Sequence, residues 1–280
     1  MTGRAPIVDF DAAYFNGGAI PGADAYPERW RQVSAAFRER LCARGHCEQD
    51  IPYGAGERQR YDLFLPEGEP AGLVVFVHGG YWKAFDKSLW SHLARGAVER
   101  GHAVAMPSYT LCPNARIAGI GAEIARFLDH VAARIAGPIR LSGHSAGGQL
   151  VARLASVGCP ISAATRERIA TVVSISGLHD LRPLMKTRMN EILRIDAAEA
   201  LAESPAFLTP AAEARIIAYV GAAELPEFRR QNALLADIWH GLGARTQTIE
   251  AEGRHHFDVI DELEDPASRL TRILTGTQGD

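Results

Sequence analysis

One serine in the segment LSGHSAGGQL could act as a nucleophile, because its hydroxyl lies between closely spaced glycines. Gly143, Ser145 and Gly147 form a G-x-S-x-G pattern directly after a short apolar run and directly before a helical pattern. In this strand-turn-helix context the small neighbours relieve crowding at a strained turn, and the serine oxygen projects over the sheet edge. Glycine and serine are also common turn residues, so the prediction needs a base, an acid and an oxyanion hole in support.

The segment VHGGYW is a candidate oxyanion hole. It is a glycine-rich turn after an apolar run, and such a turn can aim backbone N–H groups at a developing negative charge. We assign the hole to the N–H groups of Gly80 and Tyr81, with Gly79 as a further candidate. The N–H group of Ala146, directly after the nucleophile, is expected to complete it.

The base should be a histidine late in the chain, and the segment AEGRHHFDVID offers His255 and His256. We predict His256, which directly precedes the next helical pattern, and His255 stays the alternative. A metal site is not expected from this pair, because no third ligand follows at a familiar spacing and H-E-x-x-H is absent. His78 precedes the nucleophile in the chain and His179 begins a new segment, so both are expected to fix loops by hydrogen bonding.

The acid that orients the base should follow the penultimate strand, which gives the order serine, acid, histidine. The segment IIAYVGAAELPEFRRQ offers Glu224 and Glu227 at this place. Glu224 is closer to the end of the strand pattern, whereas a carboxylate at Glu227 is already explained by the dipole of the helix that begins there. We therefore predict a triad of Ser145, Glu224 and His256.

Strand and helix patterns alternate along the chain and must position these side chains. Apolar or alternating runs predict strands at 58–66, 72–78, 102–109, 137–143, 169–176, 214–221 and 244–253. Apolar residues at three- and four-residue spacing predict helices at about 87–100, 117–136, 145–157, 226–243 and 258–275. This order indicates an α/β fold with an open, mostly parallel sheet, whose active site lies at the carboxyl ends of the strands.

No linker divides the chain, so residues 1–280 are expected to form a single domain. Two segments, about 1–50 and 178–212, do not fit the alternation. Either could cover the strand ends as a small lid, and surface decoration is the alternative.

Several aromatic residues are candidates for the walls of a substrate pocket. Trp82 and Tyr109 follow predicted strands near the candidate oxyanion hole, and we predict that they bind substrate. Tyr14, Phe15 and Trp30 would join them if the N-terminal segment folds over the site. The alternative is that these rings fill the core, as aromatic residues more often do.

Composition and charge restrict the class of partner. The 280 residues are 47% hydrophobic with a formal net charge of −3, which argues against nucleic acid or an anionic membrane and favours a small-molecule substrate.

No signal-peptide core or bilayer-length apolar run is evident, so the protein is expected in the cytoplasm, and a homodimer is left open. The four cysteines form no C-x-x-C pair and are expected to be reduced, mostly structural thiols: Cys42, Cys47, Cys112 and Cys159.

Together these motifs resemble the kynurenine formamidase (arylformamidase) branch of the α/β-hydrolases. HGGYW matches the H-G-G-x-W motif, GHSAGG the nucleophile elbow, ELPEFRRQ the acid segment and HHFDVI the base segment, while SGLHDLRPL follows the next strand. The resemblance implies an α/β-hydrolase fold with helices on both faces, the same triad, and no metal or organic cofactor. The usual aspartate of the family's D-S-P-E-F segment is Glu224 here, and its serine is Leu225.

The resemblance implies that the chain cleaves an aryl formamide, with N-formyl-L-kynurenine giving L-kynurenine and formate. The segment PSYTLCP is also similar to a stretch in hormone-sensitive-lipase-like esterases, so a carboxylesterase acting on small esters is the alternative. Tyr81 and Trp82 stand where that branch has a third glycine of its oxyanion hole, which favours the formamidase. A non-catalytic binding protein is disfavoured, because all three triad positions carry competent side chains.

Overall fold

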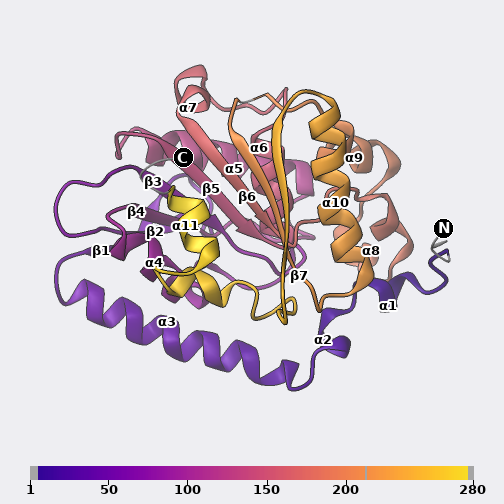
Figure 1. Cartoon of the computed structure of the whole chain (residues 1–280), viewed down its shortest axis with the longest axis horizontal. Helices are drawn as coiled ribbons and strands as arrows, with labels where there is room; N and C mark the ends of the chain where they lie inside the picture. Colours follow the sequence, from indigo (N-terminus) through magenta and orange to yellow (C-terminus); the bar gives the residue numbers. More distant parts are fainter. Residues whose placement is uncertain (1–5, 212, 277–280) are drawn as a thin grey trace.

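A computed structural model describes residues 6–211 and 213–276 and shows one eight-stranded sheet (Figure 1). The strand order is β1-β2-β4-β3-β5-β6-β7-β8. The strands are β1 (Cys47–Pro52), β2 (Arg60–Phe64), β3 (Leu73–Val77), β4 (Ala103–Pro107), β5 (Ile139–His144), β6 (Ile169–Ile175), β7 (Arg215–Gly221) and β8 (Arg245–Ala251). The pairs β1/β2 and β2/β4 are antiparallel and the other pairs are parallel, which confirms the predicted mostly parallel sheet.

Every apolar run that predicts a strand forms one, whereas β1 was not predicted. β1 is an edge strand whose residues Glu48, Gln49 and Asp50 are exposed, so its sequence carries no apolar pattern. It pairs only with β2 and is held by backbone hydrogen bonds to it. A strand of this kind is specified by its neighbour and not by burial.

Helices and short 3₁₀ helices, labelled η, connect the strands. They are α1 (Phe10–Tyr14), α2 (Asn16–Ala19), η1 (Ala23–Ala25), α3 (Tyr26–Cys42), η2 (Lys87–Leu89), η3 (Ser91–Ala94), α4 (Arg95–Glu99), α5 (Ile117–Ala132), α6 (Ala146–Leu154), α7 (Ala163–Glu167), η4 (Arg182–Lys186), α8 (Asn190–Leu193), α9 (Ala197–Ala202), η5 (Pro205–Phe207), α10 (Pro226–Gly241), η6 (Asp261–Glu264) and α11 (Arg269–Thr275). No helix in the described ranges is long and apolar enough to cross a membrane.

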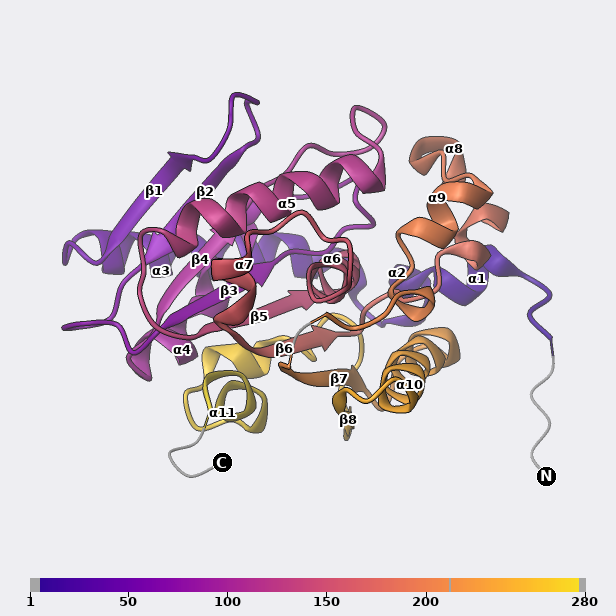
Figure 2. The ribbon, with the colours of Figure 1, turned by 90° about the horizontal axis from the view of Figure 1, so that it is seen from above.

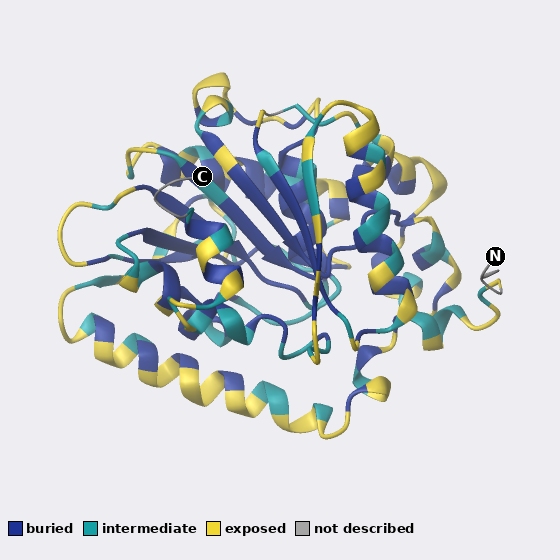
Figure 3. Ribbon diagram, in the orientation of Figure 1, coloured by how far each residue is buried: buried dark blue, intermediate teal, exposed yellow. Residues whose placement is uncertain are grey.

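The sheet is covered on both faces, with α5 and α6 on one side and α4 and α11 on the other (Figure 2). Alternate residues of β3 enter different cores: Val75 packs in the core that contains Phe127 of α5, and Phe76 packs in the core that contains Trp30 of α3. This alternation follows from the two-residue period of a strand. The central strands are therefore buried on both faces, while α3 keeps an exposed outer side (Figure 3).

Two predicted helices are interrupted. The pattern at 258–275 forms η6 and α11 with a break between them, because Pro266 lacks an N–H donor and cannot continue a helix. Ser268 then caps α11 by accepting a hydrogen bond from the backbone N–H of Thr271. The pattern at 87–100 forms η2, η3 and α4 in succession instead of one α-helix.

The two segments outside the alternation have different places in the fold. Within residues 6–50, α3 packs under the sheet, and α1 lies beside α10 near the carboxyl ends of the strands (Figure 1). Within residues 178–211, the chain forms η4, α8, α9 and η5, which pack against α5, α6 and α10; position 212 lies outside the described residues. Whether either segment acts as a lid stays a prediction.

The sequence analysis expected reduced cysteines, and this expectation was wrong for two of them. A disulfide joins Cys42 and Cys47. Cys42 ends α3 and Cys47 begins β1, and the reversal of the chain between them brings their Cα atoms to 4.6 Å. The sequence spacing alone did not indicate this turn. Cys112 and Cys159 are free and buried, as expected of structural thiols.

Candidate active site

Ser145 lies at the sharp turn between β5 and α6. Its backbone has φ 55° and ψ −116°, a conformation that is strained for a residue with a side chain. The turn requires glycine at position 147, because a Cβ atom there would lie 1.9 Å from the carbonyl oxygen of Val77. Ser145 is only 2% exposed, and its hydroxyl makes no hydrogen bond to any residue that the structure describes.

His256 follows β8 and reaches the same edge of the sheet. Its Nδ1 lies 2.7 Å from Oε2 of Glu224, and its ring packs against those of Phe228 and His144. With Nδ1–H donating to the carboxylate, Nε2 keeps its lone pair and can accept a proton. These contacts fix both the tautomer and the orientation of the ring.

Glu224 is the carboxylate that the structure brings to the histidine. While Oε2 faces His256, Oε1 accepts hydrogen bonds from the hydroxyl of Ser176 at 2.5 Å and the backbone N–H of Gly221 at 2.8 Å. The side chain is completely buried, so these donors replace water around the charge. Glu227 points elsewhere and accepts hydrogen bonds from Tyr14 and Arg230.

The other histidines near these segments have structural partners. His255 contacts the hydroxyl of Tyr26 at 3.1 Å and lies beside Asp258, away from Glu224. His78 donates from Nδ1 to the carbonyl of Gly79, and burial lowers its pKa to about 4. His179 is completely buried, and burial lowers its pKa to about 3. These histidines therefore fix loops, as the sequence predicted for His78 and His179.

Ser176 is a positioning residue that sequence reasoning missed. It is the first residue after β6, has φ 52°, and donates its hydroxyl proton to Glu224. β6 lies between β5 and β7, which precede Ser145 and Glu224 respectively. A polar residue at the end of that middle strand is the signal that could have identified it.

Replacing Ser176 with alanine is expected to lower kcat by about 10-fold to 100-fold, because a hydrogen bond to a charged group contributes about 1.5–3 kcal/mol. KM should change little, since Ser176 contacts Glu224 and not the substrate side of the histidine. The measurement is kcat and KM across a pH series with a chromogenic substrate. Threonine at this position keeps the hydroxyl and should restore most of the activity; an unchanged alanine variant would contradict the role.

The oxyanion loop has a strained backbone, with φ 107° at Gly80 and φ 49° at Tyr81. The N–H groups of Gly80, Tyr81 and Ala146 donate to no acceptor within the described ranges, so they are free to bind an oxyanion. The loop also lies against the elbow: a Cβ atom on Gly79 would be 3.0 Å from Cβ of Ser145. Glycine at position 79 permits this close approach.

Trp82 and Tyr109 pack beside this loop. Tyr109 stacks on His78 with ring centroids 4.4 Å apart and donates its hydroxyl proton to the His78 carbonyl. Trp82 donates from Nε1 to Gln149 at 3.1 Å. Both side chains are 0% exposed, as Ser145 and His256 nearly are, so their contact with substrate stays a prediction.

The N-terminal helices are attached to the oxyanion loop and to α10. Tyr81 donates its hydroxyl proton to the carbonyl of Tyr14 and accepts a hydrogen bond from Asn16 at 3.2 Å. Tyr14 in turn donates to Glu227 at 2.8 Å. Phe15 is 65% exposed and Trp30 packs in the core under α3, so of the three N-terminal aromatic candidates only Tyr14 reaches this region.

Comparison with known proteins shows two kinds of similarity. Residues 74–276 match the model of the alpha/beta hydrolase family. The chain is 29% identical over 244 residues to a kynurenine formamidase of Salmo salar, covering 82% of this chain and 81% of the relative. It is 28% identical over 251 residues to a kynurenine formamidase of Drosophila melanogaster, covering 85% and 83%. These relatives confirm the resemblance that the motifs indicated.

Solved structures give the same fold. A protein of Silicibacter sp. TM1040, provisionally assigned as a thioesterase, is 47% identical with a TM-score of 0.92, covering 96% of this chain and 99% of that one. An esterase of Pyrobaculum calidifontis is 20% identical with a TM-score of 0.65, covering 90% and 92%. The similarity to the Pyrobaculum esterase concerns the fold alone.

Proposed function

Because the chain belongs to the alpha/beta hydrolase family, we propose that it is a serine hydrolase with a triad of Ser145, His256 and Glu224 that cleaves aryl formamides. N-formyl-L-kynurenine is the expected substrate. The observation that carries the proposal is the 2.7 Å contact between His256 Nδ1 and Glu224 Oε2 at the sheet edge where Ser145 forms its strained turn. A residue order of serine, acid and histidine along the chain agrees with this family.

The proposed reaction has two stages that use the same histidine. His256 takes the proton of Ser145 as the serine oxygen attacks the formyl carbon, and Glu224 stabilises the resulting imidazolium. The backbone N–H groups of the oxyanion loop and Ala146 stabilise the tetrahedral intermediate. When the C–N bond breaks, His256 gives the proton to the departing amine. It then removes a proton from water, which attacks the formyl-serine and releases formate.

Two observations support a formamide substrate. The curated relatives are named kynurenine formamidases and align with more than four fifths of this chain. In addition, the bulky Tyr81 occupies the oxyanion loop and is held there by Tyr14 and Asn16. We expect a side chain of this size in that loop to narrow the acyl side of the site, which would leave room for a formyl hydrogen and little room for a longer acyl chain.

Hydrolysis of an acyl ester or thioester is the second candidate. It is favoured by the Silicibacter protein, provisionally assigned as a thioesterase, because that protein shares 47% of its residues with this chain. The same triad would serve, since both reactions pass through an acyl-serine. The two candidates differ in the leaving group and in the length of the acyl chain.

A panel of substrates separates the candidates. We expect kcat/KM to be higher for N-formylkynurenine than for formanilide, and at least about 10-fold lower for butyranilide than for formanilide, since an ill-fitting methylene costs about 1–3 kcal/mol. Butyryl esters and a butyryl thioester of a small thiol complete the panel. Preference for the butyryl compounds, with no detectable hydrolysis of N-formylkynurenine, would exclude the formamidase and leave the second candidate. Cleavage of activated esters alone is chemically easy and decides nothing.

A further inference from the structure

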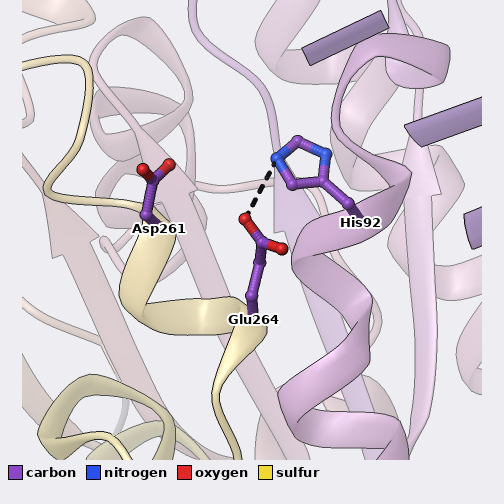
Figure 4. Close-up of side chains that lie close together, drawn as sticks. All are labelled: His92, Asp261 and Glu264. Carbon is purple, nitrogen blue, oxygen red and sulfur yellow. Dashed lines mark ion pairs between the residues drawn. The ribbon is translucent and has the colours of Figure 1, made fainter. Parts of the chain in front are cut away.

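Three acceptor side chains that are not part of the proposed triad meet between η3 and η6 (Figure 4). His92 comes from η3, and Asp261 and Glu264 come from η6. His92 Nε2 lies 3.8 Å from Oε1 of Glu264, and the nearest atoms of the three groups all lie within 4.8 Å of one another. Nothing in the proposed hydrolysis uses this cluster.

The tautomer of His92 is determined by its neighbour Ser34. The hydroxyl of Ser34 donates its single proton to the carbonyl of Leu89 at 2.7 Å, so it must accept from His92 Nδ1–H at 2.6 Å. Nε2 therefore carries a lone pair. The side chain is 2% exposed, and this lone pair is buried with no partner in the described chain. Burial, with Arg29 and Arg38 nearby, lowers the pKa of His92 to about 3, so the ring is neutral.

The two carboxylates add further acceptors and no donor. Asp261 binds Arg29 through Oδ2 at 2.7 Å, which leaves Oδ1 buried without a partner. Glu264 makes no hydrogen bond within the described residues and is 30% exposed. Buried acceptors that face one another without a donor are costly, so the geometry favours a positively charged or proton-donating occupant among them.

We propose that His92, Asp261 and Glu264 bind one divalent transition-metal ion, with Zn²⁺ as the expected occupant. An imidazole nitrogen with two carboxylate oxygens suits Zn²⁺, whereas Mg²⁺ and Ca²⁺ prefer oxygen ligands only. Ser34 holds the imidazole, and Arg29 holds Asp261, as outer partners commonly do at metal sites. Water can complete the coordination from the partly exposed side of Glu264.

Some movement of the cluster accompanies binding. Zinc ligands lie about 2.0–2.2 Å from the ion, so atoms now up to 4.8 Å apart must draw together. Glu264 is the side chain free to do so, because it is partly exposed and makes no hydrogen bond.

The bound ion would join η3 to the segment that follows His256. That segment leads from the proposed base through residues 257–260 into η6, and η6 contacts η3 and α4. A metal bridge here fixes the position of the histidine loop against the body of the protein. Its expected effect is therefore on stability, with no direct part in the chemistry.

Metal content and thermal unfolding of tag-free protein test the proposal. After EDTA treatment and removal of the chelator, addition of Zn²⁺ should restore one tightly bound ion per chain. It should also raise Tm by about 5–10 °C when free Zn²⁺ is about 100-fold above its Kd. Both effects should be lost in Glu264→Gln, which keeps the shape of a partly exposed side chain, and in His92→Gln. Glu99→Gln, which removes a surface carboxylate paired with Arg95, should behave as the unmodified protein does.

The other possible occupants of the cluster predict a different experimental result. Burial and the neighbouring Asp261 raise the pKa of Glu264, so a proton or a water molecule is the competing occupant. In that case the protein takes up no Zn²⁺ at this position, or Glu264→Gln binds Zn²⁺ and gains Tm as the unmodified protein does. Either result overturns the proposal. Should His92→Gln fail to fold, Glu264→Gln alone decides the question.

Discussion

Replacing Ser145 with alanine is expected to lower kcat by about 10⁴-fold or more, because loss of the nucleophile removes the covalent step. Tm should stay close to that of the unmodified protein, since the serine hydroxyl makes no hydrogen bond to the described residues and contributes little packing. Single-turnover and steady-state rates on the best substrate of the panel measure the first effect, and thermal unfolding measures the second.

Covalent labelling gives the matched control for this variant. A serine-directed phosphonate should add its mass once to the unmodified chain and not to Ser145→Ala. A folded alanine variant that keeps most of its activity, or that still takes up the label at full rate, would place the nucleophile elsewhere. Labelling of the unmodified chain without turnover of any substrate would favour a binding protein with the same fold.

Glu224→Gln should have the second largest effect and lower kcat by about 10³-fold to 10⁴-fold. The amide can keep the contact with His256 but cannot stabilise the imidazolium that forms when the serine proton is taken. The buried side chain of Glu224 has His256 as its charged partner among the described residues, so we expect the structural effect of the substitution to stay local. The measurement is kcat, with circular dichroism to show that the fold is retained.

Glu227→Gln is the matched control, because it is the neighbouring buried glutamate on the same turn. It should lower kcat only mildly and lower Tm instead, since Glu227 bonds Tyr14 and Arg230 and not the histidine. The reverse order of the two effects would make Glu227 the acid. Equal small effects would mean that another carboxylate orients His256.

The sequence predicted the central strands well, for a physical reason. Strands covered on both faces must be apolar throughout, so β3 through β7 appear as short apolar runs. Parallel strands end at the same edge of the sheet, so the order along the chain was enough to predict the contact of Glu224 with His256, while the role of Ser145 beside them stays a prediction.

What the sequence did not predict depends on contacts between distant segments. Ser176 matters because β6 lies between the strands that precede Ser145 and Glu224, and its own segment carries no motif. His92 and Glu264 are brought together by the packing of η3 on η6. The hydrogen bond from Trp82 to Gln149 was not predicted either, because it depends on the packing of α6 beside the loop.

The contact between Tyr14 and Glu227 also has a consequence for the time course of synthesis. The two residues are 213 positions apart, so Tyr14 leaves the ribosome long before its partner exists. At about 5–20 residues per second, the delay is about 10–40 s. During that time the N-terminal helices lack the carboxylate that holds them to α10, and the nascent chain exposes the surface of the oxyanion loop that they later cover. The edge of the sheet where the chemistry is proposed is therefore completed only after Glu227 and His256 have been synthesised.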